Sequence, residues 1–83
     1  MRRLFKSIIS NHKATYEEIL NRIKDVLYHG QLVSESSSGD IRIITIQYGY
    51  LVYHIVYMGR SIVFFECSGL YAFDIIVKSG DLL

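Results

Sequence analysis

The sequence predicts an α+β fold in which an N-terminal helical segment packs on an antiparallel β-meander of four to five strands. Two observations lead to this prediction. Residues 16–28 repeat apolar side chains at helical spacing, whereas residues 41–77 are rich in β-branched and aromatic side chains and are interrupted by glycine at regular intervals. The chain has 83 residues, of which 51% are hydrophobic. This length fits one domain, residues 1–83, whose small core must be efficient or be completed by an oligomer.

The first 13 residues form a basic segment. They contain Arg2, Arg3, Lys6 and Lys13 and no acidic residue, so their formal charge is +4. Residues 14–83 hold five basic and eight acidic residues, for a formal charge of −3. A basic segment on a mildly acidic body can contact nucleic acid or an acidic protein surface. The four basic residues are therefore candidates for nucleic-acid binding, and a solvated helix face that keeps the protein in solution is the alternative.

Residues 3–10 are expected to form a short helix within the basic segment. One helical face would hold the apolar side chains of Leu4, Phe5, Ile8 and Ile9. The polar run at residues 10–12 would then separate this helix from the next one. A short strand is the competing interpretation of the same residues.

The main helix is predicted within residues 14–30, from Tyr16 to Tyr28. Thr15 followed by Glu18 is the signature of a capping box, in which each side chain accepts the free backbone N–H of the other residue. The apolar residues recur on one face, which indicates a helix with one buried side. Gly30 is expected to end the helix as a C-terminal cap.

Residues 31–83 are expected to form the antiparallel sheet. Four strands are predicted at residues 41–48, 51–58, 61–67 and 70–77. The dipeptides between them, Gly49-Tyr50, Gly59-Arg60 and Ser68-Gly69, each contain glycine and fit two-residue hairpin turns. A short fifth strand is predicted at residues 31–35, joined to the others by a serine-rich loop at residues 34–40.

Two-residue turns fix the register, and the register decides which side chains share a face. The expected pairs are Tyr48 with Leu51, Ile44 with Ile55, Tyr53 with Glu66, Ile55 with Phe64, and Phe64 with Phe73. One face is then an apolar core face that the main helix covers. The other face keeps an apolar set, and a large exposed apolar patch is typical of an interface. The predicted interface residues are Val52, Val56, Val63, Phe65 and Ile76.

The sequence contains no catalytic motif, no metal-ligand spacing and no phosphate-binding loop, so no cofactor and no metal are expected. Cys67 is the single cysteine and is interpreted as a packing residue. No apolar run approaches the length of a membrane span, and an intracellular, cytoplasmic protein is expected. The residues that a catalytic activity would use are His54, Arg60 and Arg42.

We expect a small protein–protein interaction module that forms a homodimer through a sheet face or binds another protein. An inhibitor, an antitoxin or an accessory protein of a virus or mobile element would fit this description. Helices on a four-stranded antiparallel sheet also resemble the architecture of RelE-type mRNA interferases. That resemblance implies an endoribonuclease toxin, or more generally a nucleic-acid-binding protein, as the alternative function.

Overall fold

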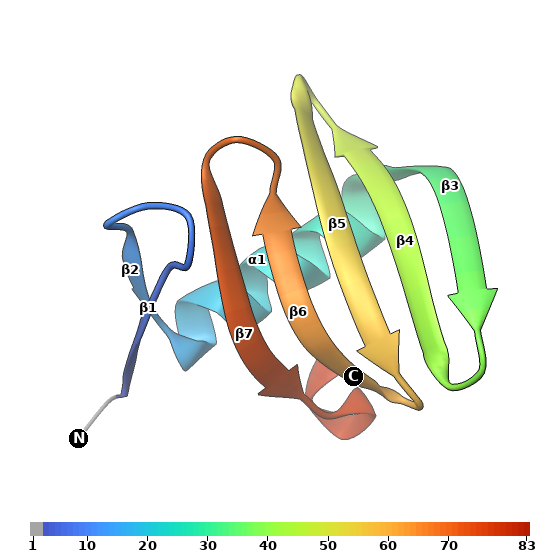
Figure 1. Ribbon diagram of the computed structural model, residues 1–83. Helices are drawn as coiled ribbons and strands as arrows, with labels where there is room; N and C mark the ends of the chain where they lie inside the picture. Colours follow the sequence, from blue (N-terminus) through green and yellow to red (C-terminus); the bar gives the residue numbers. More distant parts are fainter. Residues whose placement is uncertain (1–2) are drawn as a thin grey trace.

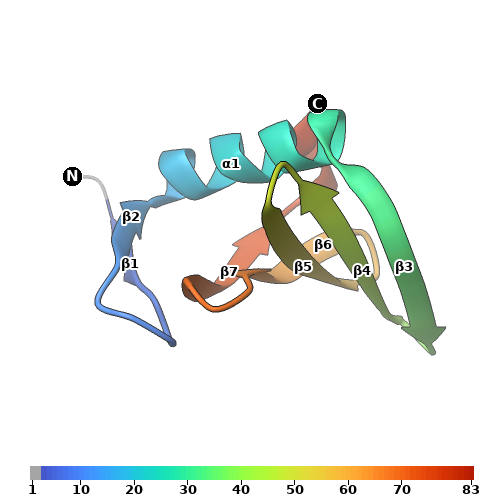
Figure 2. The same ribbon diagram turned by 90° about the horizontal axis from the view of Figure 1, so that it is seen from above.

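The amphipathic segment forms helix α1, Tyr16–His29, and α1 lies across one face of a five-stranded antiparallel sheet (Figures 1 and 2). The computed structural model describes residues 3–83. The strands follow one another along the sheet in chain order, and they are β3 (Gln31–Ser38), β4 (Ile41–Tyr48), β5 (Leu51–Met58), β6 (Ser61–Cys67) and β7 (Tyr71–Val77). A short 3-10 helix, η1 (Ser79–Leu82), follows the last strand. The predicted α+β class and antiparallel meander are confirmed.

Helix α1 begins where the sequence predicts. Thr15 Oγ1 accepts the backbone N–H of Glu18 at 3.2 Å, and Glu18 Oε1 accepts the backbone N–H of Thr15 at the same distance. This capping box satisfies two of the N–H groups that a helix leaves free at its start. The buried face of the helix consists of Ile19, Ile23 and Val26.

The end of α1 differs from a usual glycine cap. Gly30 has φ −76° and ψ 166°, an extended conformation that any residue can adopt, rather than the left-handed conformation expected there. Glycine is required at this position because there is no room for a side chain. A Cβ atom at this position would overlap with Ile46 Cγ2 and with the carbonyl oxygen of Val26. Gly30 therefore allows the helix end to lie against β4.

The close approach of β4 to the end of α1 at Gly30 leads to a prediction about stability. The substitution Gly30→Ala should lower the free energy of unfolding by about 2 kcal/mol, because the added methyl group must push β4 away from the helix. The matched control is Gly80→Ala, because a Cβ atom at Gly80 would meet no other atom within 4 Å. Urea denaturation measures both. Equal effects of the two substitutions would contradict the close approach.

The prediction of a short N-terminal helix is wrong. Residues 3–10 instead contribute β1, Leu4–Lys6, which pairs with β2, Lys13–Thr15, in a small antiparallel hairpin. Ser7 explains the difference. Its buried hydroxyl accepts the backbone N–H groups of Ile9 at 3.2 Å and Ala72 at 3.0 Å, so the side chain replaces the bonds that a helix would make.

The hairpin loop also protects one edge of the sheet. Ile8 donates its backbone N–H to the carbonyl oxygen of Ala72 at 2.8 Å, and Ser7 accepts the N–H of Ala72. These bonds occupy backbone groups on the outer edge of β7, which would otherwise be open to another strand. The opposite edge belongs to β3, whose eight residues are all exposed.

The serine-rich run is strand rather than loop. β3 extends to Ser38, and Ser38 pairs with Ile41 across the turn Gly39-Asp40. The same two-residue geometry follows at Gly49 and Gly59. All three glycines have φ near +60°, and no other residue type in the described chain has positive φ. A glycine at the first turn position with an ordinary residue at the second is the type II′ turn, which matches the twist of a hairpin.

The register is as expected from β4 to β5 and then changes. Tyr48 pairs with Leu51 and Ile44 with Ile55, as predicted. In β6, however, Val63 is an extra residue, because Tyr57 pairs with Ile62 and Val56 with Phe64. This β-bulge exchanges the two faces of β6 beyond it.

Three predicted pairs are therefore wrong. Tyr53 pairs with Cys67 rather than Glu66, and Ile55 and Phe73 both pair with Phe65 rather than Phe64. The loop from β6 to β7 has three residues, Ser68–Leu70, instead of two. The third residue of this loop compensates for the bulge in β6. The side chains of β7 therefore alternate between the core face and the other face as predicted.

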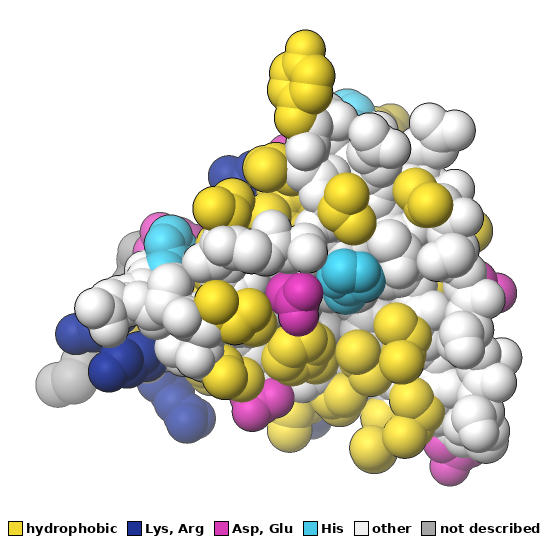
Figure 3. Space-filling view, turned by 45° about the horizontal axis from the view of Figure 1, so that its top comes forward, with side chains coloured by type: hydrophobic (Ala, Val, Ile, Leu, Met, Phe, Trp, Pro, Cys, Tyr) yellow, Lys and Arg dark blue, Asp and Glu magenta, His cyan; other side chains and the backbone are white. Residues whose placement is uncertain are grey.

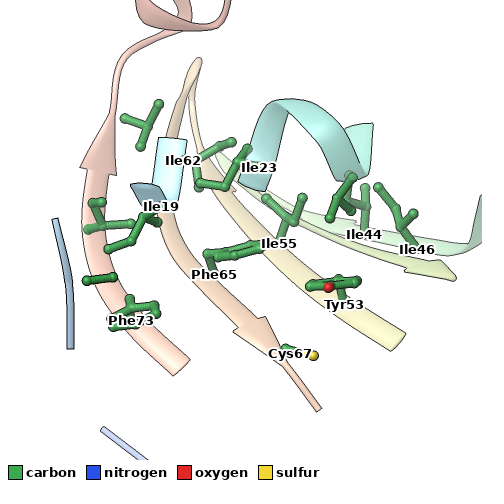
Figure 4. Packing of buried hydrophobic residues seen from close by; sticks show 14 residues of the cluster. Ile19, Ile23, Ile44, Ile46, Tyr53, Ile55, Ile62, Phe65, Cys67 and Phe73 are labelled. Atoms are coloured by element: carbon green, nitrogen blue, oxygen red, sulfur yellow. The ribbon is translucent and has the colours of Figure 1, made fainter. Parts of the chain in front are cut away.

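The core lies between α1 and the sheet (Figure 4). Tyr53, Phe65 and Phe73 are its largest fully buried side chains, and Tyr53 stacks on Phe65 with 5.6 Å between ring centres. Cys67 is also buried among them, which agrees with a packing role, and burial raises the pKa of its thiol. The full cluster is Ala14, Ile19, Ile23, Val26, Ile44, Ile46, Tyr53, Ile55, Ile62, Phe65, Cys67, Phe73, Ile75 and Val77.

The bulge predicts opposite outcomes for two adjacent phenylalanines. Phe65→Ala should lower the free energy of unfolding by about 4 kcal/mol or prevent folding, because it leaves a cavity in the core. Phe64→Ala should cost about 1 kcal/mol, because Phe64 lies on the other face of the sheet and is only half-buried. Circular dichroism with urea denaturation compares them. A larger loss for Phe64→Ala would contradict the register.

Candidate functional site

The face of the sheet opposite α1 is the candidate site, and we name it the open face. Side chains alternate between the two faces along each strand, and those on the open face point away from α1. The exposed fractions are 42% for Ile41 and Ile43, 53% for Met58 and 67% for Ile76. Val52, Val56 and Phe64 continue the apolar surface across β5 and β6. Figure 3 shows yellow apolar side chains gathered over this part of the sheet.

A polar pair interrupts the open face. His54 and Glu66 are cross-strand partners, and His54 Nδ1 lies 3.3 Å from Glu66 Oε1. Their side chains are 34% and 24% exposed, so both are partly screened from water by the residues around them. The pair gives this surface one group that can carry positive charge and one that can carry negative charge.

The predicted interface residues divide into three groups. Val52, Val56 and Ile76 lie on the open face. Val63 is the bulged residue of β6 and is half-buried beside Ile76, where both line a groove near β1. Phe65 was expected on the same face, and this placement is wrong because the bulge turns its side chain into the core.

Phe64 was expected on the core face as the partner of Ile55 and Phe73, and this placement is wrong. Phe64 and Phe65 are adjacent and equally apolar, so nothing in the local sequence shows which of them points inward. The register beyond Val63 decides it. Ile41, Ile43 and Met58 were on the correct face by alternation, yet they were not among the predicted interface residues. Their position on the neighbouring strands β4 and β5 makes them part of the same surface.

The three residues suggested for catalysis do not come together. Arg42 pairs with Tyr57 on the helix side of the sheet, where its guanidinium lies 4.5 Å from the centre of the Tyr57 ring and 3.9 Å from Glu35. His54 lies on the open face, and Arg60 is exposed at the turn between β5 and β6. A general base and a cationic group on opposite faces cannot act on one phosphate.

The predicted basic residues lie on the N-terminal hairpin, apart from Arg2, which is outside the described residues. Lys6 and Lys13 are direct cross-strand partners, and Arg3 lies 5.0 Å above the ring of Phe5. Like charges directly opposite each other destabilise a strand pair, so the hairpin concentrates positive charge at a cost to itself. Arg3 reaches the edge of the open face, where it lines a groove together with Val63 and Ile76.

Residues 3–83 contain no group of three or more His, Cys, Asp or Glu side chains that could hold a metal ion. The helices of the described chain also lack the length and the apolar character that crossing a bilayer requires. Comparisons with protein-family models, with curated proteins and with solved structures found no match. Function must therefore be inferred from the surface itself.

Proposed function

We propose that this protein is a small protein–protein interaction module, and that its open face binds a second copy of the chain. The observation that carries the proposal is the apolar character of a sheet face that no element of residues 3–83 covers. Monomeric proteins rarely leave a continuous apolar patch of several hundred Å² in water. Covering it with another protein surface would remove that patch from solvent.

The size of the open face fits a dimer. Strands lie about 4.8 Å apart and rise about 3.3 Å per residue, so five strands of seven or eight residues span roughly 24 by 25 Å. The resulting ~600 Å² matches the lower part of the ~600–1,000 Å² that each partner buries in a specific interface. The face is therefore large enough for a stable contact between two copies.

The polar pair favours a second copy over an unrelated partner. Most soluble oligomers are symmetric homo-oligomers, in which the same patch meets itself about a two-fold axis. An axis beside the pair would place His54 near the partner's Glu66 and Glu66 near the partner's His54. Each polar group would then keep a hydrogen-bond partner of suitable chemistry inside an otherwise apolar contact.

Within residues 3–83 the three catalytic candidates do not come together, which supports recognition as the biological role of such a dimer. The surfaces that remain outside the contact, including the basic hairpin and the exposed strand β3, would be free for other molecules. This arrangement supports an inhibitor, an antitoxin or an accessory protein, and an origin in a virus or mobile element is part of the same proposal.

The oligomeric state tests the proposal. Light scattering over a range of concentrations should give the mass of a dimer for the parent protein and of a monomer for Ile43→Lys, because a lysine at this position puts two buried charges into the contact. Ile9→Lys is the matched control, because Ile9 is similarly exposed but lies in the hairpin loop. It should remain a dimer. A parent protein that is monomeric at every concentration, or an unchanged Ile43→Lys dimer, would contradict the proposal.

Nucleic-acid binding by the N-terminal hairpin is the second candidate function. The observation in its favour is that Lys6 and Lys13 are held directly opposite each other, with Arg3 on the same hairpin. Their charge would attract a phosphate backbone without sequence preference.

Fluorescence anisotropy with a labelled single-stranded RNA tests this second candidate. Binding should weaken steeply with added salt and be lost in Lys6→Glu/Lys13→Glu, because the double substitution reverses the charge of the hairpin. Lys24→Glu on α1 is the control and should bind almost as well as the parent. The absence of any binding at low salt would exclude this candidate.

A further inference from the structure

A second, unrelated feature is a pocket of about 200 Å³ between the N-terminal hairpin, α1 and the last two strands. The hairpin loop contributes His12, the helix contributes Glu18 and Arg22, and the sheet contributes Phe65, Tyr71 and Phe73. The pocket is on the helix side of the sheet, so it is separate from the open face. It does not depend on the proposed dimer.

The walls of the pocket are aromatic. His12 stacks on Tyr71 with 5.0 Å between ring centres and 19° between planes, and it meets Phe73 edge-on at 5.8 Å. Tyr71 also lies 6.2 Å from Phe65. Phe65 and Phe73 are buried, so His12 and Tyr71 are the rings that a planar apolar group can contact.

The polar groups at the pocket are mostly hydrogen-bond donors. Arg22 supplies a guanidinium with several N–H groups, and Tyr71 supplies a hydroxyl whose pKa is raised by burial, so that it keeps its proton.

The acceptors nearby are already engaged. Glu18 Oε1 accepts the backbone N–H and the hydroxyl of Thr15 in the capping box. Asp25, which also attracts Arg22, accepts the hydroxyl of Tyr48 at 3.0 Å and lies 3.7 Å from His29. Arg22 and Tyr71 give the pocket hydrogen-bond donors, which a ligand with acceptor oxygens can use.

We propose that this pocket binds a small organic acid, in which a planar apolar group lies against the aromatic walls and a carboxylate faces Arg22 and the Tyr71 hydroxyl. A carboxylate offers two oxygens in the geometry that a guanidinium prefers. The size agrees as well. A cavity of about 150 Å³ holds one benzene molecule, so the pocket has room for a ring bearing one carboxylate.

A chemical-shift titration of the backbone amides with benzoate tests the proposal. Saturable shifts are expected around His12, Arg22 and Tyr71. Arg22→Gln should weaken the affinity about tenfold or more, because it removes a charge-assisted hydrogen bond. Lys24→Gln removes the same charge from the same helix outside this pocket and should leave the affinity unchanged.

Tyr71→Phe provides a second variant, which keeps the ring and removes the hydroxyl. It should weaken benzoate binding several-fold, because one donor to the carboxylate is lost. Unchanged affinity in this variant would overturn the role of the Tyr71 hydroxyl in the pocket.

Three results would overturn the proposal as a whole. They are the absence of saturable shifts with benzoate, an equal loss of affinity in Arg22→Gln and Lys24→Gln, and binding of inorganic phosphate as tight as that of benzoate. The last would show that the aromatic walls do not take part in recognition.

Discussion

An extra residue in β6, Val63, determines how the rest of this structure is arranged. Beyond it Phe65 and Cys67 turn toward α1, and Phe64 and Glu66 turn away. The aromatic centre of the core follows, because Tyr53 can stack on Phe65 only when the two strands are in this register. The three-residue loop before β7 then restores the expected alternation in the last strand. A bulge of this kind costs one ladder position and re-aims the side chains that follow it.

The same bulge gives the two faces of the sheet their different character. A single helix of 14 residues covers one face and leaves the other uncovered by any element of residues 3–83. The bulge adds Phe64 to the uncovered side and places Glu66 opposite His54 there. Ile41, Ile43, Met58 and Ile76 stay exposed on the uncovered face, and the proposed dimer rests on this apolar surface. The protected edge at β7 and the exposed strand β3 show that the N-terminal hairpin guards only one end of the sheet.

Much of the fold could be predicted from the sequence, because the signals for it are local. The capping box at Thr15 and the glycine turns act within a few residues, and they define α1 and the hairpins. The errors involve partners that are distant in sequence. Ser7 prevents an N-terminal helix by bonding Ala72, which lies 65 residues away. Phe64 and Phe65 are equivalent in composition, and only packing between β5 and β7 selects the one that enters the core. The sequence predicted which face of the sheet forms the candidate site, but not every residue on that face. The pocket at Arg22 could not be predicted, because it joins three segments that no sequence pattern connects.

Cross-strand contacts measured by NMR test the register at Val63 most directly. Nuclear Overhauser effects between facing residues of β5 and β6 report which backbone positions are opposite each other. The structure predicts contacts that join His54 with Glu66 and Tyr53 with Cys67. Contacts that join Tyr53 with Glu66 and Ile55 with Phe64 would contradict it, because they would place Phe64 in the core and turn Phe65 to the open face.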